Sequence, residues 1–265
     1  RPPRSTLFPY TTLFRSSLLL LCVTGALSAA EEVVIFGDND YRPVIFEDAQ
    51  RQSAGILSEV LRQFAQDSGT QVTIKLYPWK RAYTNAEKGL GGVIGVSRTP
   101  ERMKRFDFSA PIYDDSINVV VLKGKEFPFN SLADLKGKII GVQSGASYGS
   151  EVDAAIQSGQ LSVEADQGHI SRLNKLLHGR IEAAFIGNGQ RGLQALLESD
   201  SRLAANKDQF AVLPKPLAHD LLYLGFAKTM NKQALLDRFN RWLIGAQENQ
   251  TIDQLVRMDA EQPAN

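Results

Sequence analysis

The sequence predicts an α/β protein with two lobes, each built on a doubly wound, mostly parallel sheet. Short β-type runs alternate with helix-type segments from Glu32 onward, which is typical of parallel sheets covered by helices. The alternation occurs in two series, at about 33–96 and 131–185, and two series indicate two lobes. Two further β-type runs, 116–122 and 221–226, stand apart from these series. We expect them to cross between the lobes as paired hinge strands.

The first series opens with a continuous apolar run at 33–36, which predicts a strand buried on both faces. Residues 55–68 carry an apolar stripe at helical spacing, and Gly69 ends that helix. The elements that follow in order are a strand at 72–76, a helix at 80–88 ended by Gly89, and a strand at 92–96.

The second series begins near Ser131, which can cap a short helix together with Asp134, with Gly137 closing it. The later elements are strands at 138–142, 162–165 and 181–185 and helices at 149–157 and 170–178. After the crossing strand at 221–226, we expect a helix capped by Asn231 and running to about Gln247. These bounds predict lobe 1 at 31–117 plus 221–265, and lobe 2 at 118–220.

Composition bounds the function. The 265 residues are 43% hydrophobic and 22% charged, which is ordinary for a globular protein. A formal net charge of +1 gives no electrostatic argument for a nucleic-acid partner. One cysteine, Cys22, and three histidines argue against a disulfide framework and a zinc site. We expect no metal and no cofactor.

Residues 1–30 lie outside the predicted fold. Residues 1–16 resemble translated sequencing-adapter DNA, and an apolar run at 18–27 with small residues to Ala30 follows. This is the core and cleavage end of a secretory signal peptide, too short to span a bilayer of ~30 Å. A buried strand is the alternative. We therefore expect an artefact plus a signal-peptide remnant, cleavage after Ala30, and a periplasmic product.

Several segments contain residue types common in catalytic or binding sites, but the surrounding sequence does not match a known motif. The glycines at 89–95 precede a strand, whereas the glycines of a dinucleotide-binding fingerprint follow one. Residues 141–145 match neither a phosphate-binding loop nor a nucleophile elbow. His169, His178 and His219 lack ligand spacing and are interpreted as structural or surface residues. The adjacent Asp114 and Asp115 are interpreted as a solvated pair.

Two polar segments stand at predicted strand ends, where α/β sheets bind ligands. In residues 97–102, Ser97 and Thr99 offer hydroxyls and Arg102 offers a planar fork for a carboxylate. An arginine in solvent at a helix start is the alternative.

The second segment, 141–149, opens a helix and can present backbone N–H groups to an anion. Ser144, Ala146 and Ser147 belong to its turn, and a simple structural turn is the competing interpretation.

Aromatic residues follow two other strands. Tyr41 and Trp79 can supply apolar walls and a π-face for a cationic ligand group, although core packing would also explain them.

Together these segments resemble the periplasmic solute-binding proteins of family 3, the polar amino-acid receptors of ABC importers. The resemblance runs from Val33 to about Met258 and is carried by residues 55–60, 97–102, 108–113, 134–142 and 179–184. It implies a type II periplasmic binding protein fold that closes on a small carboxylate-bearing solute, a membrane permease as partner, and a monomer. It also implies that Arg102 and the Ser144–Ser147 turn bind the ligand's carboxylate and that Tyr41 stacks on the ligand.

One departure concerns the ligand's ammonium. The family usually carries an aspartate where this chain has Gly187 and Asn188. Losing a charged hydrogen bond of roughly 1.5–3 kcal/mol weakens binding at least tenfold unless another group replaces it. Asn188 as a neutral acceptor and Trp79 through a cation–π contact are the replacements we expect.

Two alternative functions remain open at this stage. A ligand-sensing module would present the bound solute to a separate receptor. A dehydratase or lyase on a related fold would need a cleft base, for which Glu47 or Asp114 are the candidates. We expect a binding protein and not an enzyme.

Overall fold

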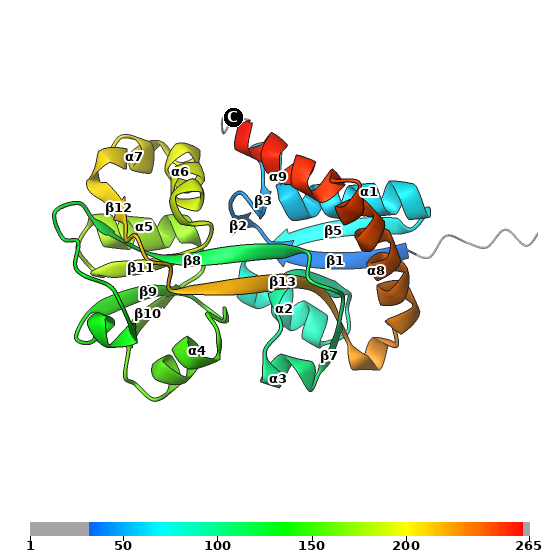
Figure 1. Cartoon of the computed structure of the whole chain (residues 1–265), viewed down its shortest axis with the longest axis horizontal. Coiled ribbons are helices and arrows are strands. Elements are labelled where there is room, and N and C mark those ends of the chain that lie inside the picture. Colours follow the sequence, from blue (N-terminus) through cyan, green and yellow to red (C-terminus); the bar gives the residue numbers. More distant parts are fainter. Residues whose placement is uncertain (1–31, 262–265) are drawn as a thin grey trace, which may run out of the picture.

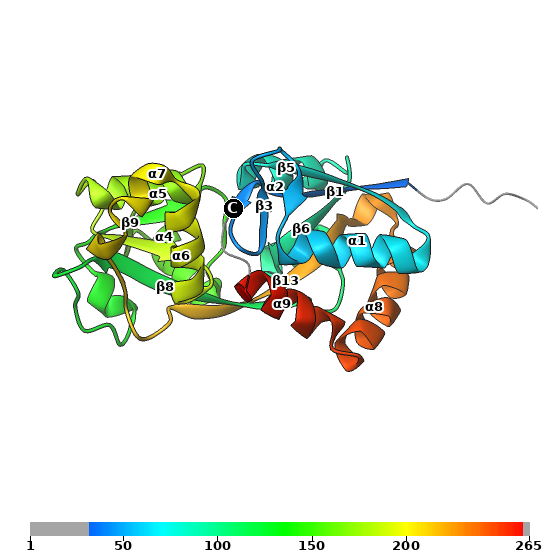
Figure 2. The same cartoon turned by 90° about the horizontal axis from the view of Figure 1, so that it is seen from above.

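The computed structural model describes residues 32–261, and side chains as far as Arg257. The expected signal peptide and Cys22 therefore lie outside the described residues. Figures 1 and 2 show two bodies of helices and strands with the long strands β8 (Tyr113–Leu122) and β13 (Ala218–Ala227) running between them. Among residues 32–261, no helix is long and apolar enough to cross a membrane.

The other strands are β1 (Glu32–Asp38), β2 (Asp40–Tyr41), β3 (Ile45–Glu47), β4 (Ser53–Ala54), β5 (Gln71–Tyr77), β6 (Gly92–Ser97), β7 (Phe106–Phe108), β9 (Ile139–Gln143), β10 (Ser162–Asp166), β11 (Ala183–Ile186) and β12 (Phe210–Val212). The α-helices are α1 (Ile56–Ser68), α2 (Trp79–Glu87), α3 (Pro100–Met103), α4 (Ser150–Gln157), α5 (His169–Leu177), α6 (Gly189–Ser199), α7 (Ser201–Ala204), α8 (Gln233–Glu248) and α9 (Thr251–Glu261). Short 3₁₀ turns occupy Leu132–Leu135, Lys207–Gln209 and Lys228–Met230.

The main sheet runs in the order β10-β9-β11-β8-β13-β6-β1-β5. Strand β1 pairs in parallel with β5 and β6, and β9 pairs in parallel with β10 and β11. Residues 113–117 of β8 pair antiparallel with residues 218–222 of β13. Beyond that segment, β8 pairs with β11 and β12, whereas β13 pairs with β6 and β7. The two-lobed α/β architecture is confirmed, with the two sheets joined where the crossing strands meet.

Each lobe has its own core. In lobe 1, Phe239 of α8 packs edge-on against Phe64 of α1 with ring centroids 5.0 Å apart, and both side chains are buried. In lobe 2, Tyr148 packs edge-on against Phe185 at 5.1 Å. Helix α1 ends at Gly69 in the left-handed conformation (φ 67°), as its position after the apolar stripe predicts.

Some expected elements differ in the structure. Asn231 does not cap α8: it is left-handed (φ 52°), ends the preceding 3₁₀ turn, and α8 begins at Gln233. The expected helix at 170–178 lies at His169–Leu177, and the strand expected at 181–185 begins only at Ala183. The capping box of Ser131 and Asp134 is confirmed, on a 3₁₀ turn. Sequence patterns missed the small β2–β3–β4 sheet and the helices α6 and α9.

Replacing the core ring of α8 tests how much this packing stabilises the fold. Because Phe239 is fully buried, we expect Phe239→Ala to lower the free energy of unfolding by about 3–5 kcal/mol in urea titrations. Ile244→Ala on the same helix is the control, because Ile244 is 53% exposed, and it should change stability by no more than about 0.5 kcal/mol. Equal losses in both variants would contradict this view of the core.

Candidate functional site

A cavity lies between the two lobes. Several strands of both lobes end at it, with Asp38 closing β1, Ser97 closing β6 and Gln143 closing β9. Its lining comes from both lobes and from the hinge strands: Asp38, Tyr41, Trp79, Gly95, Ser97, Ile117, Gln143, Ala146, Ser147, Tyr148, His169, Arg172, Phe185, Gly187, Asp220 and Leu222.

Five of the nine sequence-predicted ligand residues line this cavity: Tyr41, Trp79, Ser97, Ala146 and Ser147. The other four, Thr99, Arg102, Ser144 and Asn188, do not line it. Thr99 instead caps α3 by accepting a hydrogen bond from the Arg102 N–H at 3.2 Å. The Ser144 N–H donates to the Asp166 carbonyl at 2.8 Å, which fixes the turn that follows β9.

Arg102 lies at the edge of the cavity and bridges the lobes. Its guanidinium donates to the Ser97 carbonyl at 3.1 Å and to the Gly145 carbonyl of lobe 2 at 3.2 Å. It also lies over the rings of Tyr83 and Trp79, 5.0 and 5.7 Å from their centroids. The side chain is buried, so the alternative of a solvent-exposed arginine is wrong. Its charge is met here by carbonyl oxygens and aromatic faces.

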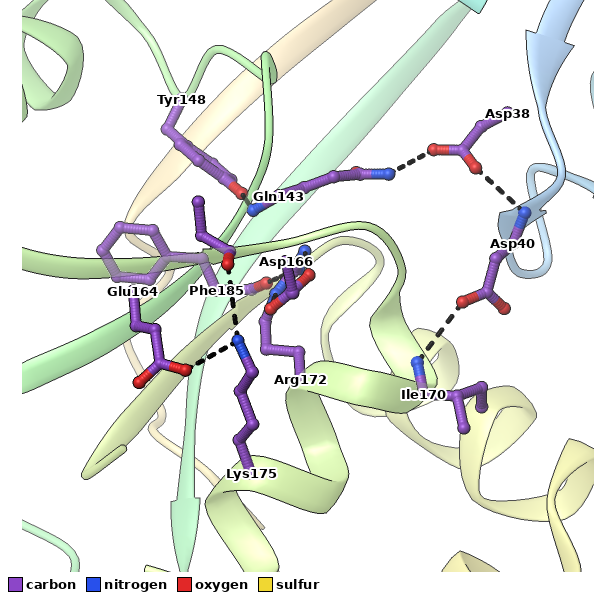
Figure 3. A network of polar contacts seen from close by, with 11 residues as sticks. Asp38, Asp40, Gln143, Tyr148, Glu164, Asp166, Ile170, Arg172, Lys175 and Phe185 are labelled. Carbon is purple, nitrogen blue, oxygen red and sulfur yellow. Dashed lines mark hydrogen bonds and ion pairs between the residues drawn. The ribbon is translucent and has the colours of Figure 1, made fainter. Parts of the chain in front are cut away.

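Other hydrogen bonds join the lobes around the cavity. The Trp79 indole N–H donates to the Gly145 carbonyl at 2.9 Å. The Gln143 amide donates to the Asp38 carboxylate, and the Ile170 N–H at the start of α5 donates to the Asp40 carboxylate at 3.3 Å. Figure 3 shows Asp38, at the end of β1, and Asp40, at the start of β2, pointing toward these lobe 2 partners. The structure is therefore a closed arrangement of the two lobes.

The cavity floor contains a buried ion pair. Arg172 of α5 donates twice to the Asp166 carboxylate, at 2.9 and 3.1 Å, and once to the Phe185 carbonyl at 2.7 Å (Figure 3). Both side chains are almost fully buried. The Arg172 charge facing the cavity is thus neutralised by its own lobe.

Three acids at the cavity have raised pKa values, chiefly because burial disfavours the charged form. The pKa of Asp38 rises to about 7, although the Asp40 N–H and Gln143 lower it in part. The pKa values of Asp115 and Asp220 both rise to about 6. Asp115 accepts hydrogen bonds from the Tyr41 hydroxyl and from the Asn188 N–H at 2.7 Å, and Asp220 accepts one from the Ser97 hydroxyl at 2.5 Å.

One of these acids corrects an interpretation made from the sequence. Asp115 is fully buried, so the solvated pair expected at 114–115 is wrong for its second member, because successive residues of β8 face opposite sides. Sequence reasoning also missed Asp38 and Asp220. Asp38 follows the apolar run of β1 directly, which is a signal of a strand-end position; Asp220 gave no such signal.

The histidines divide by environment. His178 and His219 are exposed, whereas His169 is buried and stacks on Tyr41 with ring centroids 5.5 Å apart. Burial and the nearby Arg172 hold the pKa of His169 well below its usual value, so its ring is neutral. Within residues 32–261, no group of three or more His, Cys, Asp or Glu side chains is arranged to hold a metal ion.

The position expected to bind an ammonium, 187–188, is built differently. A Cβ atom at Gly187 would lie 2.6 Å from the Asp115 carboxylate and 2.8 Å from the Tyr41 ring, so the backbone approaches both closely. The Asn188 side-chain oxygen accepts a hydrogen bond from the Tyr113 hydroxyl. It is therefore engaged with the hinge strand.

Breaking the buried ion pair tests its structural role. Arg172→Met leaves the Asp166 carboxylate buried without its partner, so we expect the free energy of unfolding to fall by about 3–5 kcal/mol in urea titrations. Arg180→Met is the control, because its ion pair with Glu164 is exposed at 3.5 Å and should contribute at most about 1 kcal/mol. A loss below 1 kcal/mol at Arg172 would contradict the assignment.

The raised pKa of Asp38 predicts a pH-dependent stability. Since the folded-state pKa of about 7 lies above the unfolded value near 4, the folded protein binds more protons between these limits. Its stability relative to an Asp38→Asn variant should therefore fall as pH rises from 4 to 7 and stay low above 7.

Urea titrations at pH 5 and pH 8 measure this difference. We expect Asp38→Asn to gain more stability over wild type at pH 8 than at pH 5, because the wild-type carboxyl is ionised only at the higher pH. The variant keeps the hydrogen bond to Gln143, since the Gln143 amide can turn to meet the new side chain. The exposed Asp208→Asn should give the same small difference at both pH values. A pH-independent effect at Asp38 would show that its carboxyl is not protonated near neutrality.

Known proteins with similar sequences identify the family to which this fold and cavity belong. The family model for bacterial extracellular solute-binding proteins, family 3, matches residues 33–258. The L-cystine-binding protein TcyJ of Escherichia coli (strain K12) is 26% identical over 176 residues, which cover 66% of this chain and 65% of that protein. The arginine-binding extracellular protein ArtP of Bacillus subtilis (strain 168) is 26% identical over 256 residues, which cover 91% of this chain and 94% of ArtP.

A solved structure supports the fold. The substrate-binding protein of an amino acid ABC transporter superposes with a TM-score of 0.69 at 23% identity, covering 87% of this chain and all of that one. At this identity the likeness establishes the two-lobed fold and leaves the ligand open.

Proposed function

The chain belongs to the bacterial extracellular solute-binding proteins, family 3, and on that premise we propose that it captures a small solute, an amino acid or a close relative, between its lobes for an ABC importer. Lobe 1 comprises residues 31–117 and 221–265, and lobe 2 comprises 118–220. The protein acts outside the cytoplasm as a monomer and delivers its ligand to a membrane permease.

The observation that carries this proposal is the cavity, which receives side chains from both lobes beside the paired strands β8 and β13. A ligand there contacts both lobes at once and favours the closed arrangement over an open one. The hinge strands absorb the change because few residues need to alter their backbone angles. The relatives TcyJ and ArtP are named for cystine and arginine, which supports an amino-acid ligand.

The ligand's carboxylate is assigned to Arg102 and the turn at 144–147. The guanidinium stands beside the cavity, where its Nη2 donates to the Gly145 carbonyl next to the lining residue Ala146. A carboxylate is a stronger acceptor for a guanidinium than a carbonyl, because both partners are charged and two parallel hydrogen bonds form. The bound ligand would thus replace the carbonyl contact.

Binding without catalysis is the proposed role, because two of the cavity acids are already engaged. Asp38 accepts from the Asp40 N–H on one oxygen and from Gln143 on the other. Asp115 accepts from the Asn188 N–H on one oxygen and from Tyr41 on the other. Hydrogen bonds thus occupy both oxygens of these two carboxylates, and Asp220, which accepts one from Ser97, is assigned to binding the ligand. Recovery of the ligand unchanged after incubation with the protein would support this role.

Thermal unfolding with each of the common L-amino acids tests the function. Protein stripped of ligand by unfolding and refolding should unfold at a higher temperature with its cognate amino acid, because the ligand binds the native state. Arg102→Met keeps the aliphatic stem and should weaken calorimetric affinity at least tenfold, with the exposed Arg98→Met as control. Stabilisation by no amino acid would contradict the function; unchanged affinity in Arg102→Met would contradict only the carboxylate site.

A further inference from the structure

We propose that Asp220 binds the positively charged nitrogen of the ligand, with Ser97 orienting its carboxylate. The inference rests on the proposed function and deepens it, since it makes Asp220 a residue that determines specificity. The ligand class that it selects is an amine, either an amino acid or a diamine, with its cationic nitrogen directed toward the hinge.

Asp220 stands where the ligand must lie. It belongs to the segment of β13 that pairs with β8 between the lobes, opposite Asp115 in the ladder, and its half-buried side chain lines the cavity. Its Oδ2 accepts the Ser97 hydroxyl hydrogen bond at 2.5 Å. Within residues 32–261, its Oδ1 accepts no side-chain or backbone hydrogen bond, which leaves one carboxylate oxygen open to the cavity.

No cation of the described residues forms an ion pair with this carboxylate, although the Arg102 guanidinium acts on it from a distance and lowers its pKa in part. Among the described residues, no Lys, Arg or His nitrogen lies within ion-pair distance of Asp220. The Arg102 guanidinium is nearby, but its donors are directed to the Ser97 and Gly145 carbonyls. Arg172 is neutralised by Asp166.

The surrounding charges add to the negative character of this corner. The carboxylates of Asp115 on β8 and Asp153 on α4 raise the pKa of Asp220, whereas Arg102 on α3 lowers it in part. A half-buried carboxylate with one neutral donor and two acidic neighbours is stabilised most by a cation. The ligand is the group that can bring one.

The other candidate positions are less suited to an ammonium. Asp38 and Asp115 each accept hydrogen bonds on both oxygens, and the Asn188 oxygen accepts from Tyr113. Asp220 is thus the carboxylate of these three with an oxygen to spare. It can replace the acid that the family resemblance placed at 187–188, from the hinge strand β13, where it pairs with Asp115.

Calorimetry with compounds of similar length tests the assignment: L-lysine, L-arginine, cadaverine and glutarate. We expect at least one of the three amines to bind the wild type and glutarate not to bind. Asp220→Asn should weaken amine binding by roughly 10- to 150-fold, as for a lost charged hydrogen bond. Asp114→Asn is the matched control, because Asp114 is an exposed acid on the partner hinge strand, and it should leave affinity unchanged.

A ligand-free measurement separates a binding defect from a folding defect. Because burial disfavours the Asp220 carboxylate and no ion pair compensates it, Asp220→Asn should unfold at a higher temperature than wild type at pH 8, and the difference should narrow at pH 5, where the carboxyl is more protonated. A variant that unfolds at a lower temperature at pH 8 would show that the carboxylate is already compensated, and would overturn the inference.

The binding outcomes are likewise distinct. Amines that bind wild type and Asp220→Asn equally, or glutarate binding in place of the amines, overturn the role of Asp220 while the solute-binding function stands. If neither these compounds nor any common amino acid binds, the proposed function and this inference are both overturned.

Discussion

The antiparallel pairing of residues 113–117 with 218–222 is the constraint on which the rest of the structure depends. Through these two strands the sheet of one lobe continues into the sheet of the other, so strand ends from both lobes face one cavity. The pairing also fixes which hinge side chains turn inward. Asp115 and Asp220 are opposite each other in the ladder and both lie on the cavity side, whereas Asp114 and His219 are exposed.

Electrostatics then differentiates the cavity walls. Lobe 2 contributes the Arg172 guanidinium, whose charge is neutralised within that lobe by an ion pair with Asp166. Lobe 1 and the hinge contribute carboxylates whose partners are neutral donors: Gln143 for Asp38, Tyr41 for Asp115 and Ser97 for Asp220. Burial is the largest cause of the raised pKa values of all three, and it outweighs the partial lowering by Arg172 at Asp38 and by Arg102 at Asp220. These buried carboxylates make the folded protein less stable than neutral side chains would. Such a loss of stability is common at sites that bind a charged partner.

The polar contacts between the lobes explain how the closed arrangement holds its shape. Trp79 and Arg102 share the Gly145 carbonyl as acceptor, and Asp40 caps the start of α5 from the other lobe. These contacts lie around the cavity, and Arg191 of α6 adds one away from its lining by donating to the Val256 carbonyl of α9 at 2.9 Å, whereas each lobe retains a separate apolar core. The lobes can therefore separate without exposing either core, as a protein that must admit and release a solute requires.

The sequence by itself determined the two-lobed α/β fold, because apolar runs, helical stripes and glycine stops are local patterns with a fixed period. Of the ligand residues that it predicted, Tyr41, Trp79, Ser97, Ala146 and Ser147 line the cavity, since each lies at or just after the carboxyl end of a predicted strand. Only the tertiary structure decided the partners of the charges. Arg102 meets carbonyls, Asn188 meets Tyr113, and Asp220 stands open beside Ser97, 123 positions away in the chain. A charge's partner depends on which distant strands lie side by side, and no local spacing encodes that.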